Sequence, residues 1–118
     1  MCLLIDKKIP QPNKKFFWKV IRRNGRPLYR ILNNVNYLKQ TVIKSDRSSK
    51  RPLTWELPYI HYGIHVLYTR RDARLLLARK LVQCKIIKVY VNPNDWVASG
   101  WFNDKKAAVF MKVRTKPS

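Results

Sequence analysis

FFWKVIRRNG, residues 16–25, is the stretch that decides the fold. Its side chains alternate, with Phe16, Trp18 and Val20 on one side and Lys19 on the other. A period of two residues predicts a β-strand, because successive side chains of a strand point to opposite faces. We therefore expect a strand here, with its cations on the solvent side.

The dipeptide that ends this stretch predicts a tight turn. Asn24 and Gly25 favour a type I′ hairpin, because both residue types tolerate positive φ angles. The return strand would run over Leu28–Leu32, and Val35–Ile43 has the apolar content of a third strand. The N-terminal part is therefore predicted to be an antiparallel hairpin or meander.

One segment further along the chain has a helical pattern. Thr69 and Asp72 match a Thr-x-x-Asp relative of the capping box, and residues 70–82 are rich in helix formers. Polar residues 44–52 predict a mobile basic loop. The expected strands outside the meander are a short edge strand over 53–59, a buried strand over 63–68, and two strands after the helix over 85–92 and 107–114.

These elements predict the class of fold. The order of strands, one helix and further strands is typical of an α+β domain with a mainly antiparallel sheet. A length of 118 residues fits one domain over 1–118. We expect a single main helix near 70–82, followed by two further strands.

The charge is the strongest indication of function. The chain has 26 Lys and Arg against 6 Asp and Glu, a net charge of +20. At most six cations can find a carboxylate, so about twenty must face water or an external anion. The cations alternate with apolar residues, which indicates a folded basic surface and not a disordered tail.

Cysteine use and hydropathy indicate the setting. Cys84 lies among apolar residues and is expected to be a buried thiol, and two cysteines make no disulfide framework. No stretch approaches 18 apolar residues, so no membrane-spanning helix and no membrane partner are expected. A cytoplasmic, intracellular setting is the expectation.

Residues for catalysis or metal binding are sparse, so we expect no enzymatic activity, metal or cofactor. Glu56 is the single glutamate, and a hydrolase needs two positioned carboxylates. His61 and His65 are four apart in a strand-like run, about 13 Å from each other at about 3.3 Å per residue. One metal ion cannot take both, so His65 is expected in a hydrogen-bonded core or a pocket. The three isolated glycines form no phosphate-binding loop.

Basic residues gather in three places that fit phosphate contacts. One is the predicted hairpin, where aromatic residues that can stack on bases interleave with the cations. The second is the polar loop, and the third is the start of the helix, where cations oppose the helix dipole. The predicted nucleic-acid-binding residues are Lys14, Lys15, Lys19, Arg22, Arg23, Arg26, Arg47, Lys50, Arg51, Arg70, Arg71 and Arg74.

Two resemblances accompany these patterns. The run Tyr62-Gly63-Ile64-His65-Val66, the helix start at Arg71-Asp72-Ala73 and the strand over 86–91 before Asp95-Trp96-Val97-Ala98 resemble a strand–helix–strand segment of small uncharacterised phage-encoded proteins. The resemblance spans about half of the chain. It implies a viral or mobile-element origin and no particular activity.

The run Leu28-Tyr29-Arg30, followed by the Gly63 strand and the helix, is similar to ADP-ribosyltransferase-like folds. By that resemblance Arg30 would contact the ribose or phosphate of NAD. Arg30 and His65 are the two candidate pocket residues, Arg30 from this resemblance and His65 from its position between Ile64 and Val66. The Glu-x-Glu pattern of that family does not occur in this sequence.

The expected function is non-enzymatic binding of DNA or RNA, largely through phosphate contacts. A second hypothesis is a viral inhibitor or accessory protein that docks on an acidic protein or nucleoprotein surface. The third hypothesis is that the chain is an ADP-ribosyltransferase-like protein.

Overall fold

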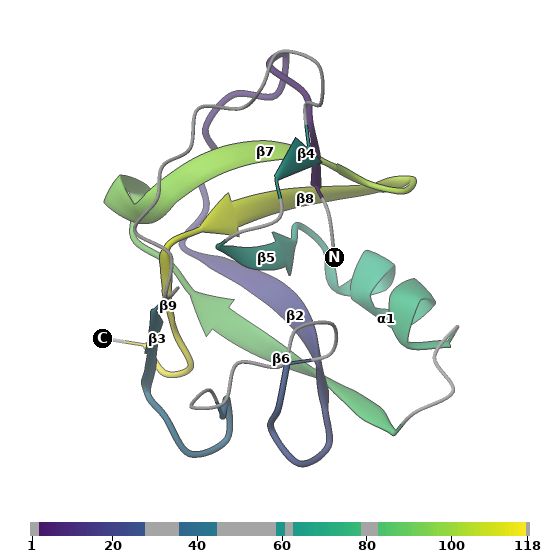
Figure 1. Ribbon diagram of the computed structural model, residues 1–118, viewed down its shortest axis with the longest axis vertical. Coiled ribbons are helices and arrows are strands. Elements are labelled where there is room, and N and C mark those ends of the chain that lie inside the picture. The colour runs from purple at the N-terminus through teal and green to yellow at the C-terminus, as the bar shows by residue number, and fades with distance from the viewer. Residues whose placement is uncertain (1–2, 28–35, 45–58, 61–62, 79–82, 118) are drawn as a thin grey trace.

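The computed structural model describes residues 3–27, 36–44, 59–60, 63–78 and 83–117. Its elements are β1 (Leu3–Ile5), β2 (Phe16–Arg22), β3 (Val42–Lys44), β4 (Tyr59–Ile60), β5 (Ile64–Leu67), α1 (Arg70–Ala78), β6 (Cys84–Tyr90), the 3₁₀ turn η1 (Pro93–Asp95), β7 (Trp96–Phe102), β8 (Lys105–Phe110) and β9 (Lys112–Arg114). The nine strands form one sheet in the order β3-β9-β6-β2-β5-β8-β7-β1-β4, and α1 lies beside it (Figure 1). The predicted α+β class is confirmed in its coarse form, with a sheet that outweighs the helix.

β2 lies inside the sheet, between β6 and β5. It pairs with β6 along its whole length, from Phe16 opposite Tyr90 to Arg22 opposite Cys84. The predicted strand is confirmed. The return strand predicted over 28–32 lies outside the described residues. The third strand of the expected meander does not join β2, because β3 pairs with β9 at the edge of the sheet. A central position lets both faces of β2 bury apolar area, which a short N-terminal meander could not provide.

The two faces of the sheet carry separate apolar clusters. On one face Phe17 packs against Tyr68 and Phe110, with ring centroids 5.1 Å and 5.2 Å apart. On the other face Ala73 and Leu76 of α1 belong to a cluster that includes Val20 of β2. The helix therefore covers part of one face, while the opposite face encloses the aromatic core.

The turn after β2 differs from the predicted type. The Gly25 N–H donates to the Arg22 carbonyl at 2.9 Å, and the Arg22 N–H donates to the Arg26 carbonyl at 3.0 Å. Gly25 has a φ of 91°, whereas Asn24 is not among the residues with positive φ. A three-residue loop with one left-handed glycine is typical of a type I turn followed by a bulge. The hairpin turn is confirmed and the type I′ form is wrong.

α1 begins where the sequence predicts. The Asp72 N–H donates to Thr69 Oγ1 at 3.2 Å, so Thr69 caps the helix. Ala73 and Leu76 are buried, while Leu75 is exposed. The predicted range continues to residue 82, and residues 79–82 lie outside the described residues.

Four strands follow α1 in the structure, and not the two that we expected. β6 confirms the first predicted strand, and the second divides into β8 and β9 at Met111, whose N–H donates to the Asp95 carbonyl. β7 was missed, because Ser99 and Gly100 indicate a turn in the sequence. Cys84 is a free, buried thiol, as its apolar neighbours predict.

Gly100 has a packing role within β7. A Cβ atom at this position would lie 1.9 Å from the Leu4 carbonyl oxygen, because β1 crosses β7 closely there. We expect Gly100→Ala to lower the free energy of unfolding by about 1–3 kcal/mol, the usual cost of overpacking. Urea denaturation measures this change, and an unchanged midpoint would show that β1 can move away at no cost.

Candidate nucleic-acid interface

Three neighbouring strands place two rings and a guanidinium in one row. Phe16 of β2 lies opposite Tyr90 of β6, and Tyr90 lies opposite Arg114 of β9. Directly opposite residues of antiparallel strands point to the same face of a sheet. The next residues along β2 and β6, Phe17 and Val89, are fully buried in the aromatic core. The row of Phe16, Tyr90 and Arg114 therefore faces outward.

A second row lies beside the first. Trp18 is opposite Lys88. Lys112, two residues before Arg114 on β9, points to the same face but lies on the other side of the first row, because β9 runs antiparallel to β6. Phe16, Lys88 and Arg114 are exposed. We call this surface the open face, and it consists of Phe16, Trp18, Lys88, Tyr90, Lys112 and Arg114.

α1 covers only the neighbouring part of this side of the sheet. Its buried residues pack near Val20 and Cys84, at the far ends of β2 and β6. At the border, the Arg70 guanidinium lies 5.6 Å from the centre of the Trp18 ring. Cation–π attraction of this kind explains why an arginine is stable at a helix start, where the dipole disfavours it.

A groove of about 720 Å³ adjoins the open face. The segment before β2, the turn after β6 and strand β9 line it. Its lining includes four basic residues, Lys14, Lys15, Lys112 and Arg114, and one acidic residue, Asp95. Phe16 and Tyr90 supply aromatic surface to the same groove. The groove therefore combines a surplus of positive charge with two rings, a combination suited to anions that carry flat groups.

The rings of Phe16 and Trp18 and the cation Lys88 contact one another on the open face. Phe16 and Trp18 pack edge to face, with centroids 6.2 Å apart. The Lys88 ammonium lies 4.4 Å from the centre of Phe16 and 5.3 Å from that of Trp18. Such contacts hold a lysine over a ring without neutralising its charge. Lys88 is therefore placed beside the aromatic surface and keeps its charge for an external anion.

The two lysines of the groove differ in their surroundings. Lys14 Nζ donates to the Tyr68 carbonyl and lies 5.2 Å from the centre of the Phe17 ring. Desolvation, and then repulsion from Lys106, lower the pKa of Lys14. Lys15 is exposed. Lys15 is therefore better placed than Lys14 to contact a phosphate.

The structure corrects the expected orientation of Lys19. Its side chain points to the core face of β2, between the buried Phe17 and Ile21. Nζ donates to the His65 carbonyl at 2.8 Å and lies 5.6 Å from the centre of the Tyr37 ring. Burial lowers the pKa of Lys19 to about 8. Lys19 therefore lies on the side of the sheet opposite to the open face.

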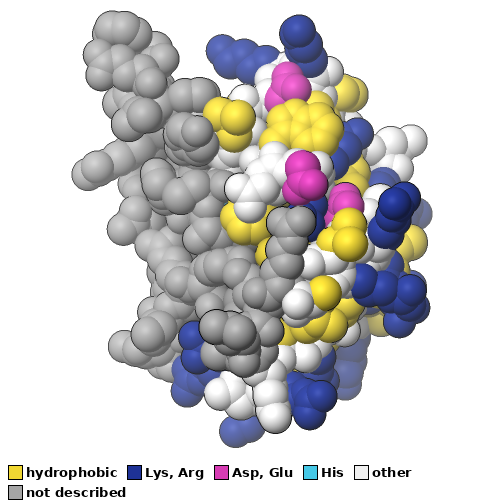
Figure 2. Space-filling model, turned by 90° about the vertical axis from the view of Figure 1, so that its right-hand side faces the viewer, with side chains coloured by type: hydrophobic (Ala, Val, Ile, Leu, Met, Phe, Trp, Pro, Cys, Tyr) yellow, Lys and Arg dark blue, Asp and Glu magenta, His cyan; other side chains and the backbone are white. Residues whose placement is uncertain are grey.

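The remaining predicted cations form separate patches. Arg22, Arg23 and Arg26 are exposed at the hairpin turn, about 20 Å along β2 from Phe16 at about 3.3 Å per residue. Arg71 and Arg74 are exposed on α1. Figure 2, which views the molecule from the side of α1, shows lysine and arginine side chains around a small group of acidic ones. Among the predicted cations that the structure describes, Lys14 and Lys15 line the groove and Arg70 lies at the border of the open face, so these described sites do not converge on one point.

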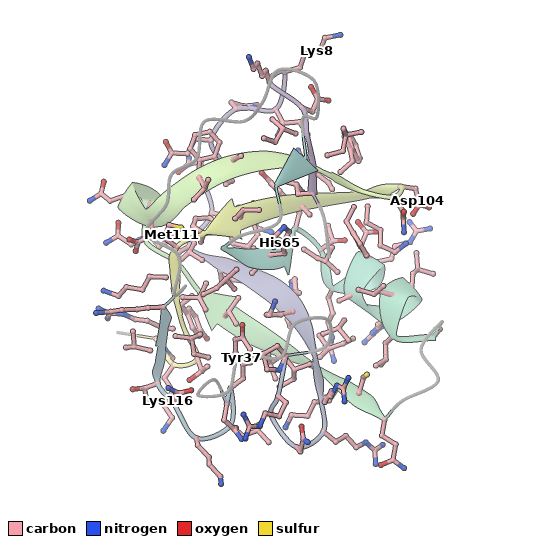
Figure 3. The ribbon with its side chains drawn as sticks, in the orientation of Figure 1. Lys8, Tyr37, His65, Asp104, Met111 and Lys116 are labelled. Atoms are coloured by element: carbon pink, nitrogen blue, oxygen red, sulfur yellow. The ribbon has the colours of Figure 1, made fainter. Side chains whose placement is uncertain are left out.

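Some predicted residues lie outside the described part of the chain, namely Arg30, Arg47, Lys50 and Arg51. His65, expected in a core or a pocket, is buried in β5, and Figure 3 shows it in the middle of the sheet. The groove does not include it among its lining residues. A place in the core is therefore the better description of His65.

Two kinds of feature do not occur among the described residues. Within them, no three His, Cys, Asp or Glu side chains gather where they could hold a metal ion. No helix in the described ranges is long and apolar enough to cross a membrane.

Sequence reasoning missed the cations that complete the open face. Lys88 and Tyr90 alternate with buried residues in β6, and Lys112 alternates with Val113 in β9. That alternation was available in the sequence. What it could not supply is the pairing of β9 with β6 and of β6 with β2, which brings Arg114 beside Tyr90 and Phe16.

Comparisons with protein-family models, with curated proteins and with solved structures found no match to this chain.

Proposed function

We propose that this protein binds nucleic acid through the open face and the adjoining groove. The observation that carries the proposal is the groove itself, which Lys15, Lys112 and Arg114 line together with the rings of Phe16 and Tyr90 and a single acidic residue, Asp95. The cations fit phosphates, which supply most of the affinity of non-specific nucleic-acid binding. The role is one of binding and not of catalysis.

The overall charge supports the same proposal. A net charge of +20 on a chain of 118 residues attracts polyanions and accelerates their encounter with the surface. Lys88, Arg114 and Lys15 are exposed, so a phosphate can approach them without rearrangement of the sheet. The docking of this surface on an acidic protein remains a second hypothesis, because an acidic surface would meet the same cations.

Salt dependence provides the test. We expect binding of a labelled oligonucleotide to weaken steeply as salt rises from 50 to 200 mM. With about five phosphates contacted and about −0.9 per phosphate on duplex DNA, the slope of log K against log salt would be about −4 to −5. Fluorescence anisotropy at several salt concentrations measures it.

A polyglutamate peptide of the same charge is the matched control. It offers carboxylates without bases or phosphates, so we expect it to compete weakly. Affinity for the oligonucleotide that ignores salt would contradict the proposal. Equal competition by polyglutamate would favour the docking of an acidic protein.

A further inference from the structure

The aromatic side chains that line the groove indicate the kind of ligand more closely than its charge does. Phe16 and Tyr90 lie directly opposite each other on β2 and β6, and both line the groove. Cβ atoms of such opposite residues are about 4.5–5.5 Å apart, so the rings are neighbours on one wall. Phe16 keeps 37% of its surface exposed, although a ring of this size is usually buried. More than a third of Phe16 is therefore accessible to a ligand in the groove.

The neighbouring cations define what could cover the rings. Arg114 lies opposite Tyr90, Lys112 is two residues away, and Lys15 precedes Phe16 directly. A ligand over the rings would therefore have flat apolar groups flanked by negative charges. A nucleic-acid strand has this chemistry, since each nucleotide joins a planar base to a phosphate.

The two aromatic rings indicate whether the bound nucleic acid is single-stranded or double-stranded. Bases in a duplex stack on one another, so a duplex offers phosphates and groove edges but not base faces. Unpaired nucleotides expose their faces, and aromatic side chains beside a basic groove are the usual means of binding them. The volume of about 720 Å³ lies within the range of about 300–1,000 Å³ that holds small ligands. A groove of this size suits one or two nucleotides better than a double helix.

Lys88 fits this arrangement. Its ammonium lies over Phe16 at 4.4 Å from the ring centre, and the side chain is exposed. A lysine on a flexible four-carbon stem can leave the ring when a base arrives and reach the phosphate of the same nucleotide. The ring is thus covered by a group that a nucleotide can displace.

We propose that the groove selects single-stranded over double-stranded nucleic acid, with bases stacked on Phe16 and Tyr90 and phosphates held by Lys15, Lys112 and Arg114. This inference rests on the proposed nucleic-acid binding. It adds the form of the nucleic acid and the residues that recognise that form.

The test compares labelled 12-nucleotide oligo-dT and oligo-rU with a duplex of equal phosphate number, by fluorescence anisotropy at fixed salt. We expect the protein to bind a single strand at least about 10-fold more tightly than the duplex, since one stacked base contributes about 5- to 150-fold. Phe16→Leu with Tyr90→Leu should weaken single-strand binding by about 10- to 100-fold. Duplex binding and the salt slope should change little.

Two further variants distinguish the loss of base stacking from the loss of folded protein. Trp101→Leu removes an aromatic side chain of similar exposure, 36%, from β7 outside the groove, and should change neither affinity. Phe16→Trp provides a larger stacking surface and should preserve or increase single-strand affinity, a result that unfolding cannot produce. Circular dichroism checks that each variant is folded.

The outcomes separate the two proposals. Equal affinity for strand and duplex, or equal losses of both in the double leucine variant, would overturn single-strand selection and leave nucleic-acid binding intact. Absence of binding to every oligonucleotide at low salt would overturn both proposals.

Discussion

Reversing the charge of Lys112 and Arg114 together should weaken oligonucleotide binding by about 100-fold or more at low salt. Both side chains line the groove, and Arg114 lies beside Tyr90 in the outward row of the open face. Hydrogen bonds to charged groups contribute about 1.5–3 kcal/mol each, so the loss of two corresponds to at least about two powers of ten. Two lost phosphate contacts should also make the salt slope shallower by about 2.

The change to glutamate is compatible with the fold. Lys112 lies opposite Lys44 on β3, and both Lys112 and Arg114 point away from the buried Val113. A glutamate at position 112 would therefore face a lysine across the strand pair, which is a favourable cross-strand arrangement. Thermal denaturation should show a stability close to that of the unchanged protein.

The matched control is the double change Arg22→Glu and Arg23→Glu at the hairpin turn. It alters the net charge by the same amount, about 20 Å along β2 from Phe16. We expect a loss of less than about 10-fold, because these cations act there mainly through the long-range field. Equal losses in the two double variants would mean that total charge, and not the groove, determines affinity.

The sequence predicts a helix or strand well when the residues of that one segment are enough to determine it. β2 and the start of α1 are of this kind, since alternation and the Thr69 cap are local properties. The turn type was wrong although the turn was placed correctly. The turn closes through a single residue with positive φ, Gly25, and through the hydrogen bonds between Arg22 and both Gly25 and Arg26.

The arrangement of the strands could not be predicted in the same way. β2 pairs with β6 and β5, which lie more than forty residues away along the chain, so the pairing is decided by the burial of Phe17, Ile21 and Val89 together. The candidate site also depends on pairing between strands that are far apart in the sequence. Lys15 and Arg114 share a groove only because β6 lies between β2 and β9.

Lys19 shows the limit of reading alternation alone. The pattern places Trp18 and Lys19 on opposite faces, which is correct, but it does not say which face is the core. Phe17 and Ile21 are fully buried in the aromatic core, whereas Phe16 is exposed, so at this end of β2 the odd-numbered face is the interior, although Val20 on the other face is buried beneath α1. The sequence thus suggested a surface lysine where the sheet places one in the core.

The ammonium of Lys19, which belongs to a half-buried side chain directed at the aromatic core, should make the protein less stable at neutral pH than it would be with an apolar residue. Burial lowers the pKa of Lys19 from 10.5 to about 8, because the charged form loses its hydration. At about 1.36 kcal/mol per pKa unit this costs about 3 kcal/mol when the group is charged. The hydrogen bond to the His65 carbonyl offsets part of the cost. We expect Lys19→Met to raise the free energy of unfolding at pH 7 by about 1–3 kcal/mol.

The dependence on pH gives the sharper test. Below pH 8 the lysine is protonated in both the folded and the unfolded chain, so the full cost is present. Between pH 8 and 10.5 the unfolded chain binds more protons than the folded one, so stability rises with pH. Above 10.5 both states are neutral and the cost is gone. Urea denaturation at pH 7 and at pH 10 should show this rise in the unchanged protein and a smaller one in Lys19→Met.

Lys15→Met is the matched control, because Lys15 is exposed and precedes the same strand. It removes the same charge from the net +20 but should leave the rise between pH 7 and 10 intact. In binding assays the order reverses: Lys15→Met should weaken oligonucleotide binding and Lys19→Met should not. If Lys19→Met kept the full pH-dependent rise, the buried ammonium would not be its source. If it weakened binding as much as Lys15→Met, the core face of β2 would have to be accessible to the ligand.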